Sequence, residues 1–85
     1  MPLTERIKLC RINNKETQSE AAEALGIIQT HYSKYERGKI EINVRYLKLL
    51  CEHWNVTADY LLGLTDIPYT LDSKSNVFVT VVLRN

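Results

Sequence analysis

Three side chains between residues 28 and 37 carry groups that can contact the edge of a base pair. The amide of Gln29 can donate to N7 and accept from N6 of adenine, and the amine of Lys34 can donate to O6 and N7 of guanine. The methyl group of Thr30 can pack on a thymine. Most Gln and Lys residues are simply solvated, so these residue types acquire meaning only from the elements that position them.

Residues 17–38 are typical of two short helices joined by a tight turn. Thr17 and Glu20 can form a capping box, in which each side chain accepts a hydrogen bond from the other residue's backbone N–H. Gly26 would end the first helix at a position that needs a positive φ. Gln18 falls in the first turn, where free N–H groups and the helix dipole favour an anion such as phosphate.

The second helix of this pair is expected over residues 28–37. Tyr32 and Tyr35 are three residues apart, so both should pack inward together with Ile27, the apolar anchor of the turn. Gly38 should end the helix. The polar residues that remain form an outward row, which consists of Gln29, Thr30, Ser33, Lys34 and Arg37.

Apolar residues at helical spacing predict three further helices, at residues 3–13, 44–54 and 58–62. Asn43 and Thr57 are suitable N-caps for the last two. In the last helix Leu61 and Leu62 are expected to face inward. The pattern therefore predicts an all-α domain over residues 1–64.

Composition sets broad limits on this domain. The 85 residues are 45% hydrophobic and 25% charged, as in one small globular domain. The net charge of +1 does not indicate nucleic acid, but residues 34–48 hold five basic residues against two acids, a local cluster of the kind that phosphate contact needs. Charge alone favours a solvated mixed surface. No apolar run reaches the roughly 18 residues of a membrane span, and no signal peptide is evident, so a cytoplasmic location is expected.

The residues do not favour catalysis or a cofactor. Cys10 and Cys51 lie among apolar neighbours without metal-ligand spacing, so buried reduced thiols are expected. Cys51 and His53 point apart on a helix, because they are two residues apart, and cannot form a nucleophile pair. His31 is far from His53 in sequence and on a different helix. We expect no enzyme, no metal and no cofactor.

The last twenty residues differ in character from the rest. Residues 65–75 are turn and linker material, and residues 76–85 contain a β-branched and aromatic run that predicts a strand. A lone strand leaves its backbone groups unpaired, so pairing with a second copy around a two-fold axis is the simplest expectation. A flexible tail, or a segment cut from a longer protein, is the alternative. The residues expected to form the dimer are Val77, Phe78, Val79, Val81 and Leu83.

The spacing of several motifs resembles the Cro/C1-type (XRE-like) helix-turn-helix family over residues 4–64. The turn glycine in TQSEAAEALGI, the run SKYERGK and the close in NVTADYLLGL occur at the family's separations. The resemblance implies a five-helix, lambda-repressor-like DNA-binding fold, with the helix of residues 28–37 in the major groove. It implies base-facing roles for Gln29, Thr30 and Lys34, and phosphate contacts for Gln18, Arg37 and Lys39. It also implies a buried ion pair between Arg11 and Glu36. From their own chemistry we add His31 to the expected base contacts and Ser33 to the expected phosphate contacts.

Four residues depart from the family pattern. Ile28 stands where Ser or Thr usually caps the recognition helix, and Glu16 stands where an apolar residue is usual. Tyr32 replaces the commoner aliphatic residue, so its hydroxyl needs a hydrogen-bond partner or a route to solvent. His31 is unusual and can touch phosphate, a base or water.

Taken together, the sequence predicts a transcriptional regulator that binds double-stranded DNA as a homodimer on a pseudo-palindromic operator. We expect it to be a repressor. Two alternatives remain open. One is an antitoxin that grips a protein partner through its C-terminal strand by β-augmentation. The other is a protein-interaction module that has kept the helical fold.

Overall fold

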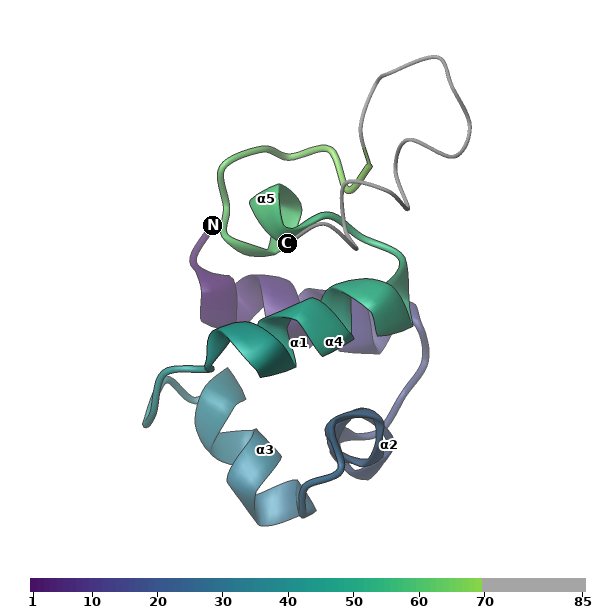
Figure 1. Cartoon of the computed structure of the whole chain (residues 1–85), viewed down its shortest axis with the longest axis vertical. Coiled ribbons are helices and arrows are strands. Elements are labelled where there is room, and N and C mark those ends of the chain that lie inside the picture. Colours follow the sequence, from purple (N-terminus) through teal and green to yellow (C-terminus); the bar gives the residue numbers. More distant parts are fainter. Residues whose placement is uncertain (70–85) are drawn as a thin grey trace.

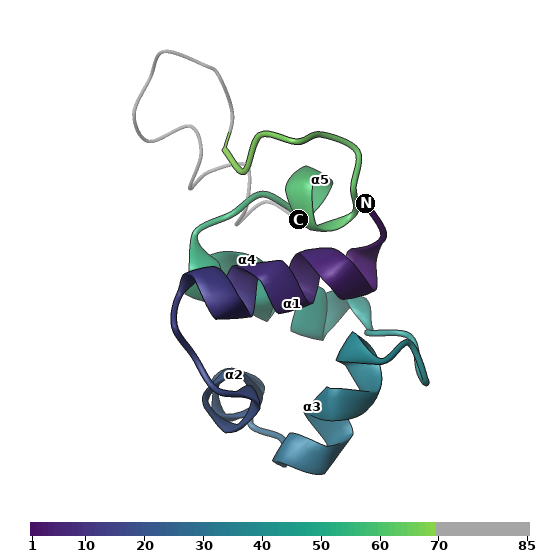
Figure 2. The same ribbon diagram turned by 180° about the vertical axis from the view of Figure 1, so that it is seen from behind.

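The computed structural model describes residues 1–69, which form five helices and no strand within that range. The helices are α1 (Leu3–Asn13), α2 (Gln18–Leu25), α3 (Gln29–Glu36), α4 (Val44–Trp54) and α5 (Ala58–Leu61). Helices α2 and α3 lie at one end of the molecule, α5 lies at the other, and α1 and α4 lie between them (Figures 1 and 2). The expected all-α architecture is confirmed. The expected strand in residues 76–85 falls outside the described residues.

The local signals that start and stop the helices act as expected. The Glu20 N–H donates to Thr17 Oγ1 at 3.1 Å, and the Thr17 N–H donates to Glu20 Oε1 at 2.8 Å, which completes the capping box before α2. Gly26 follows α2 with a φ of 70°, a conformation that costs other residues a clash of their Cβ. Asn43 caps α4 through its side chain, at 2.8 Å from the Tyr46 N–H.

Helix α3 begins without a side-chain cap. Ile28 occupies the N-cap position in an extended conformation and makes no side-chain hydrogen bond, while its carbonyl accepts from His31 and Tyr32. The helix is therefore one residue shorter at each end than residues 28–37. The start of α3 is fixed by packing, because Tyr32 and Tyr35 on its inward side are 0% and 4% exposed.

One core prediction is wrong. Leu61 is fully buried, but Leu62 is 46% exposed. Consecutive helical residues point about 100° apart, so the single turn of α5 cannot direct both leucines inward. Tyr60, which is 9% exposed, takes the second inward position instead.

Glu16, which stands where the family prefers an apolar residue, accepts hydrogen bonds from two side chains of α4. Trp54 Nε1 donates to Glu16 Oε1 at 2.8 Å, and His53 Nε2 lies 2.6 Å from Glu16 Oε2. The carboxylate thus gives a polar partner to the indole of a buried tryptophan, which otherwise would lose a hydrogen bond on burial. This pairing ties the connection between α1 and α2 to the end of α4.

The chain after α5 returns to the body of the domain. Arg6 of α1 donates to the carbonyl of Thr65 at 3.0 Å and to Asp66 Oδ1 at 2.6 Å, and its guanidinium lies 4.1 Å from the centre of the Tyr60 ring. The Thr57 N–H donates to the carbonyl of Pro68 at 3.0 Å. The first residues of the segment expected to be a linker are therefore attached to the domain.

Candidate nucleic-acid interface

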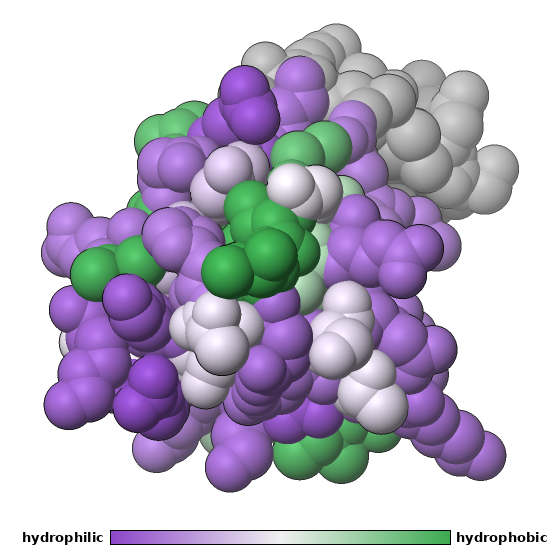
Figure 3. All heavy atoms as spheres, turned by 90° about the horizontal axis from the view of Figure 1, so that it is seen from below, coloured by the Kyte–Doolittle hydropathy of each residue, from purple (hydrophilic) through white to green (hydrophobic). Residues whose placement is uncertain are grey.

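The outward side of α3 presents the polar row that the sequence predicts. Thr30 and Lys34 are exposed, and Ser33 is half-buried between them. Arg37, directly after the helix, and Lys39 in the following loop are also exposed. Figure 3 looks onto the end of the molecule that carries α2 and α3, and its surface is mostly hydrophilic, with a compact hydrophobic patch near the centre. An exposed helix with donors on its outer side has the form that the major groove accepts.

Gln29 is half-buried at the start of α3, and its amide does not point freely into solvent. Gln29 Nε2 donates to Gln18 Oε1 at 2.6 Å, across the turn from α3 to α2. Gln18 Nε2 in turn donates to Glu36 Oε1 at 3.1 Å. The residue expected to read a base and the residue expected to bind phosphate are therefore joined by a hydrogen bond.

Glu36 accepts hydrogen bonds from side chains of three helices, α1, α2 and α3 itself. Arg11 Nε donates to Glu36 Oε2 at 2.7 Å, and a terminal nitrogen of the same guanidinium donates to Oε1 at 3.2 Å. The hydroxyl of Tyr32 donates to Oε2 at 2.6 Å, which supplies the partner that this tyrosine needed. The two side chains of the ion pair are 13% and 3% exposed for Arg11 and Glu36. The ion pair implied by the resemblance is present, and it joins α1 to α3.

The pKa values around Glu36 follow from these contacts. Burial opposes the charged form of Glu36, but hydrogen bonds from Arg11, Tyr32 and Gln18 outweigh burial and hold its pKa below the ordinary value. Burial, together with the hydrogen bond to Glu36, raises the pKa of Tyr32. The hydrogen bond to Glu36 raises the pKa of Arg11. The site therefore holds a carboxylate, a phenol and a guanidinium in their ordinary charge states near neutral pH.

His31 lies on the flank of α3 and contacts Tyr35. Its Nε2 is 3.0 Å from the Tyr35 hydroxyl, and the two rings meet edge to face with centres 5.2 Å apart. The hydrogen bond leaves Nδ1 of His31 as its other polar atom. Tyr35 also packs edge to face on Tyr46 of α4, with ring centres 6.2 Å apart, so this flank of α3 rests on a stack of aromatic rings.

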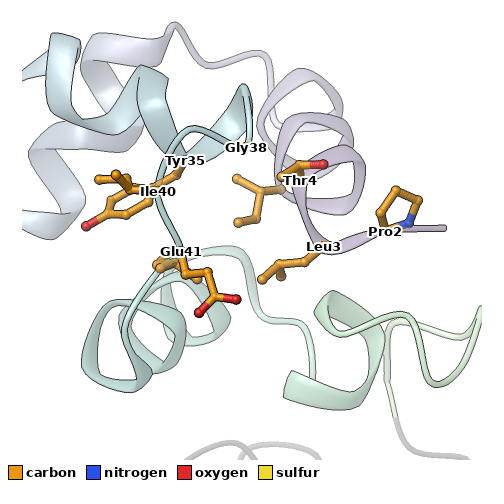
Figure 4. A pocket seen from close by; sticks show the side chains of 9 residues that line it. Pro2, Leu3, Thr4, Tyr35, Gly38, Ile40 and Glu41 are labelled. Atoms are coloured by element: carbon orange, nitrogen blue, oxygen red, sulfur yellow. The ribbon is translucent and has the colours of Figure 1, made fainter.

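Two features near α3 were not predicted. The side chain of Ile28, immediately before Gln29, is 71% exposed. The sequence showed that Ile28 cannot cap α3 through its side chain, but it did not indicate that this side chain faces solvent. A groove of about 290 Å³ lies between α1 and the end of α3, and it is lined by Pro2, Leu3, Thr4, Ile7, Tyr35, Gly38, Ile40, Glu41 and Ile42. Figure 4 shows Leu3 and Thr4 across the groove from Tyr35 and Ile40. These residues are distant in sequence, so no local pattern indicates the groove.

The cysteines are buried and unpaired, as predicted. Burial raises the pKa of Cys10 to about 11 and that of Cys51 to about 12, so both thiols stay protonated and poorly reactive at neutral pH. Within residues 1–69, no group of three His, Cys, Asp or Glu residues could hold a metal ion. No helix of this part of the chain is long and apolar enough to cross a membrane.

Comparison with known proteins gives consistent relatives. Over 72 residues the chain is 38% identical to the SPbeta prophage-derived uncharacterized HTH-type transcriptional regulator YonR of Bacillus subtilis. The matched region covers 85% of this chain and 67% of YonR. It is 34% identical over 73 residues to the uncharacterized HTH-type transcriptional regulator YobD, covering 86% and 65%, and 39% identical over 67 residues to the HTH-type transcriptional regulator ImmR, covering 79% and 53%, both from the same organism.

The chain thus spans between about half and two thirds of the length of these relatives. No solved structure matches it significantly. A family model described as "Helix-turn-helix" matches residues 7–61, which include α2, α3 and the turn between them. The chain therefore belongs to the helix-turn-helix family, of the Cro/C1 (XRE-like) type that its motifs resemble.

Proposed function

We propose that this protein is a sequence-specific, DNA-binding transcriptional regulator that places α3 in the major groove. The observation that carries the proposal is the outward polar row on and directly after α3, in which Thr30, Lys34 and Arg37 are exposed. The buried Arg11–Glu36 ion pair joins the opposite side of α3 to α1. The names of the relatives YonR, YobD and ImmR describe transcriptional regulators, which supports the same function here. The chemistry is recognition by hydrogen bonding, with no catalytic step.

Each residue of the interface has a proposed role. Gln29, Thr30, His31 and Lys34 contact bases. Gln18, Ser33, Arg37 and Lys39 contact phosphates and fix the register of the protein without reading sequence. Gln18 suits this role because it begins α2, where unpaired N–H groups favour an anion. A dimer that makes about 6–10 such contacts loses affinity steeply as the salt concentration rises.

The regulator is proposed to act as a homodimer and a repressor. Residues 76–85 would pair with the same segment of a second copy through Val77, Phe78, Val79, Val81 and Leu83, with residues 65–75 as the connection. Two recognition helices on one face of the duplex then require half-sites about 34 Å apart. The operator of the dimer would be pseudo-palindromic, because the symmetry of the DNA site mirrors the two-fold symmetry of the protein.

The test is selection of bound DNA from a random pool, with the mass in solution measured in parallel. A palindromic consensus and the mass of a dimer are expected. In the selected site, Gln29→Ala should cost about 1–3 kcal/mol chiefly at one base pair, whereas Lys39→Ala should weaken binding to all sequences alike. Lys8→Ala, an exposed lysine of α1 outside the proposed interface, is the matched control and should change little. Equal losses on specific and random DNA for Gln29→Ala would remove Gln29 from the base-reading set.

A further inference from the structure

A chain of hydrogen bonds connects the buried carboxylate of Glu36 to the amide of Gln29. Glu36 Oε1 accepts from Gln18 Nε2 at 3.1 Å, and Gln18 Oε1 accepts from Gln29 Nε2 at 2.6 Å. The chain runs from the back of α3, through the first residue of α2, to the first residue of α3. It therefore links the ion pair to the surface that is proposed to face DNA.

The direction of this chain is dictated by the charge of Glu36. An ionised carboxylate can only accept hydrogen bonds, and here it accepts from two nitrogens of Arg11, from the hydroxyl of Tyr32 and from Gln18. Gln18 must therefore turn its NH₂ group toward Glu36. Its carbonyl oxygen is then left to face Gln29, which must turn its own NH₂ group toward Gln18. One charge thus orients two amides in sequence.

Among the residues that the structure describes, this orientation leaves Gln29 with one acceptor, Oε1, and one N–H that make no hydrogen bond. This pair of groups matches the major-groove edge of adenine, which offers an acceptor at N7 and a donor at N6. Guanine offers two acceptors, N7 and O6, and one of them would face the carbonyl oxygen of Gln29. A glutamine free to rotate its amide could turn its NH₂ group to guanine instead.

We propose that Glu36 is a positioning residue for base selection: through Gln18 it holds the Gln29 amide in the orientation that accepts adenine and rejects guanine. The inference rests on the proposed function, since it assumes that Gln29 reads a base. It adds a role for a residue that touches no DNA. The Arg11–Glu36 pair then sets specificity as well as joining α1 to α3.

Glu36→Gln makes a directional prediction. The carbonyl oxygen of the new amide would stay with its two shortest donors, Arg11 Nε and the Tyr32 hydroxyl. Its NH₂ group would then face Gln18, and the longer bond from the terminal nitrogen of Arg11 would be lost. Gln18 would then turn its carbonyl toward residue 36 and its NH₂ group toward Gln29. Gln29 would accept from Gln18 through Oε1 and present its own NH₂ group outward. Each amide would then be turned the opposite way from the wild type, and the outward NH₂ group would favour guanine, which offers two acceptors.

The experiment uses the full chain and the site selected from random DNA. Gln29→Ala first identifies the base pair that Gln29 reads. Affinities are then measured for that site with adenine or guanine at this position, for the wild type, Glu36→Gln and Gln18→Met. Gln18→Met interrupts the series of hydrogen bonds between Glu36 and Gln29 and keeps both residues of the ion pair. It therefore keeps the test valid if Glu36→Gln fails to fold. The readout is the ratio of the two affinities, which a uniform loss of stability or of phosphate contact leaves unchanged.

The wild type should prefer adenine by at least about fivefold, the lower end of one bidentate contact. The preference should fall more than twofold in Gln18→Met, and it should fall further or invert in Glu36→Gln. A wild type that selects guanine at this pair, or a Gln18→Met variant whose ratio stays within twofold of the wild type, would overturn the role of Glu36 while leaving DNA binding by α3 intact. Failure of the wild type to select any sequence would instead refute the proposed function.

Discussion

Two arginines of α1, five residues apart, form ion pairs whose carboxylates differ in burial and in the number of hydrogen bonds that they accept. Arg11 and its partner Glu36 have side chains that are 13% and 3% exposed. The side chain of Arg6 is still more buried than that of Arg11, at 4%, but its partner Asp66 is 95% exposed. Within residues 1–69, the carboxylate of Glu36 accepts four hydrogen bonds, whereas that of Asp66 accepts one, from Arg6.

The comparison indicates that the burial of the carboxylate, more than the N–O distance, determines how strongly each charge depends on its partner. Both pairs have short N–O distances, 2.6 Å for Arg6 and 2.7 Å for Arg11. In the Arg11 pair both charges have left water, so each depends on the other. Arg6 has a solvated partner and relies also on the Tyr60 ring and the Thr65 carbonyl. The first pair holds α3 against α1, and the second holds the segment that follows α5.

The largest expected effect is on stability after Glu36→Ala. The substitution leaves the buried guanidinium of Arg11 without its partner, which should reduce the free energy of unfolding by about 3–5 kcal/mol. Urea denaturation followed by far-ultraviolet circular dichroism measures the loss. The control is the double variant Arg11→Met/Glu36→Leu, in which no charge stays buried. If the double variant were as unstable as Glu36→Ala, the loss would not come from the unpaired charge.

A related effect should appear in acid. The pKa of Glu36 in the folded protein is held below its ordinary value of 4.5, so the folded state gains stability from the carboxylate at pH values above 4.5. This contribution should be lost as the pH falls from that value through the folded-state pKa. Unfolding free energies measured at descending pH should therefore fall more steeply for the wild type than for Glu36→Gln. Parallel curves would exclude Glu36 as a source of acid sensitivity.

Arg6→Met should have an intermediate effect. It removes the contact of the guanidinium with Tyr60 and the hydrogen bond to Thr65, and the methionine can fill part of the vacated space. The expected loss is about 1–2 kcal/mol, measured by the same denaturation. Because Asp66 is solvated, no buried charge is left behind. A loss as large as that of Glu36→Ala would contradict the distinction between the two pairs.

The smallest effect is expected for Asp66→Asn. The carboxylate of Asp66 is 95% exposed, so water weakens its attraction to the buried Arg6 and the pair contributes at most about 1 kcal/mol. The asparagine carbonyl can still accept from Arg6. The midpoint of denaturation should therefore shift only slightly, and DNA binding should not change. High salt should reduce the difference in stability between the wild type and Asp66→Asn, because the exposed carboxylate of Asp66 is screened.

The helices and their ends were predictable because their signals are local. Thr17, Glu20 and Gly26 act within one turn of the backbone, and the inward spacing of Tyr32 and Tyr35 follows from the helical period. The error at Leu62 arose where a helix is too short for periodicity to distinguish neighbouring residues. Local pattern thus determined the five helices of residues 1–69, apart from one residue at each end of α3 and the direction of Leu62 after α5.

The long-range polar contacts were harder to predict. The Arg11–Glu36 pair was available only from the family resemblance, since its members are 25 residues apart. The bonds of Glu16 to α4 and the role of Arg6 were missed, because nothing in a single sequence indicates which distant polar group a buried charge will meet. The link from Gln18 to Gln29 was missed for the same reason, although each residue had been singled out.

The contact between Trp54 and Glu16 also makes the molecule its own optical probe. Trp54 is the only tryptophan in the sequence, it is 6% exposed, and its indole N–H is bonded to Glu16. Its fluorescence should shift to longer wavelength when α4 separates from the connection between α1 and α2, because water then replaces the buried surroundings. Intrinsic emission therefore reports the integrity of the scaffold behind α2 and α3, without a dye on the surface proposed to bind DNA.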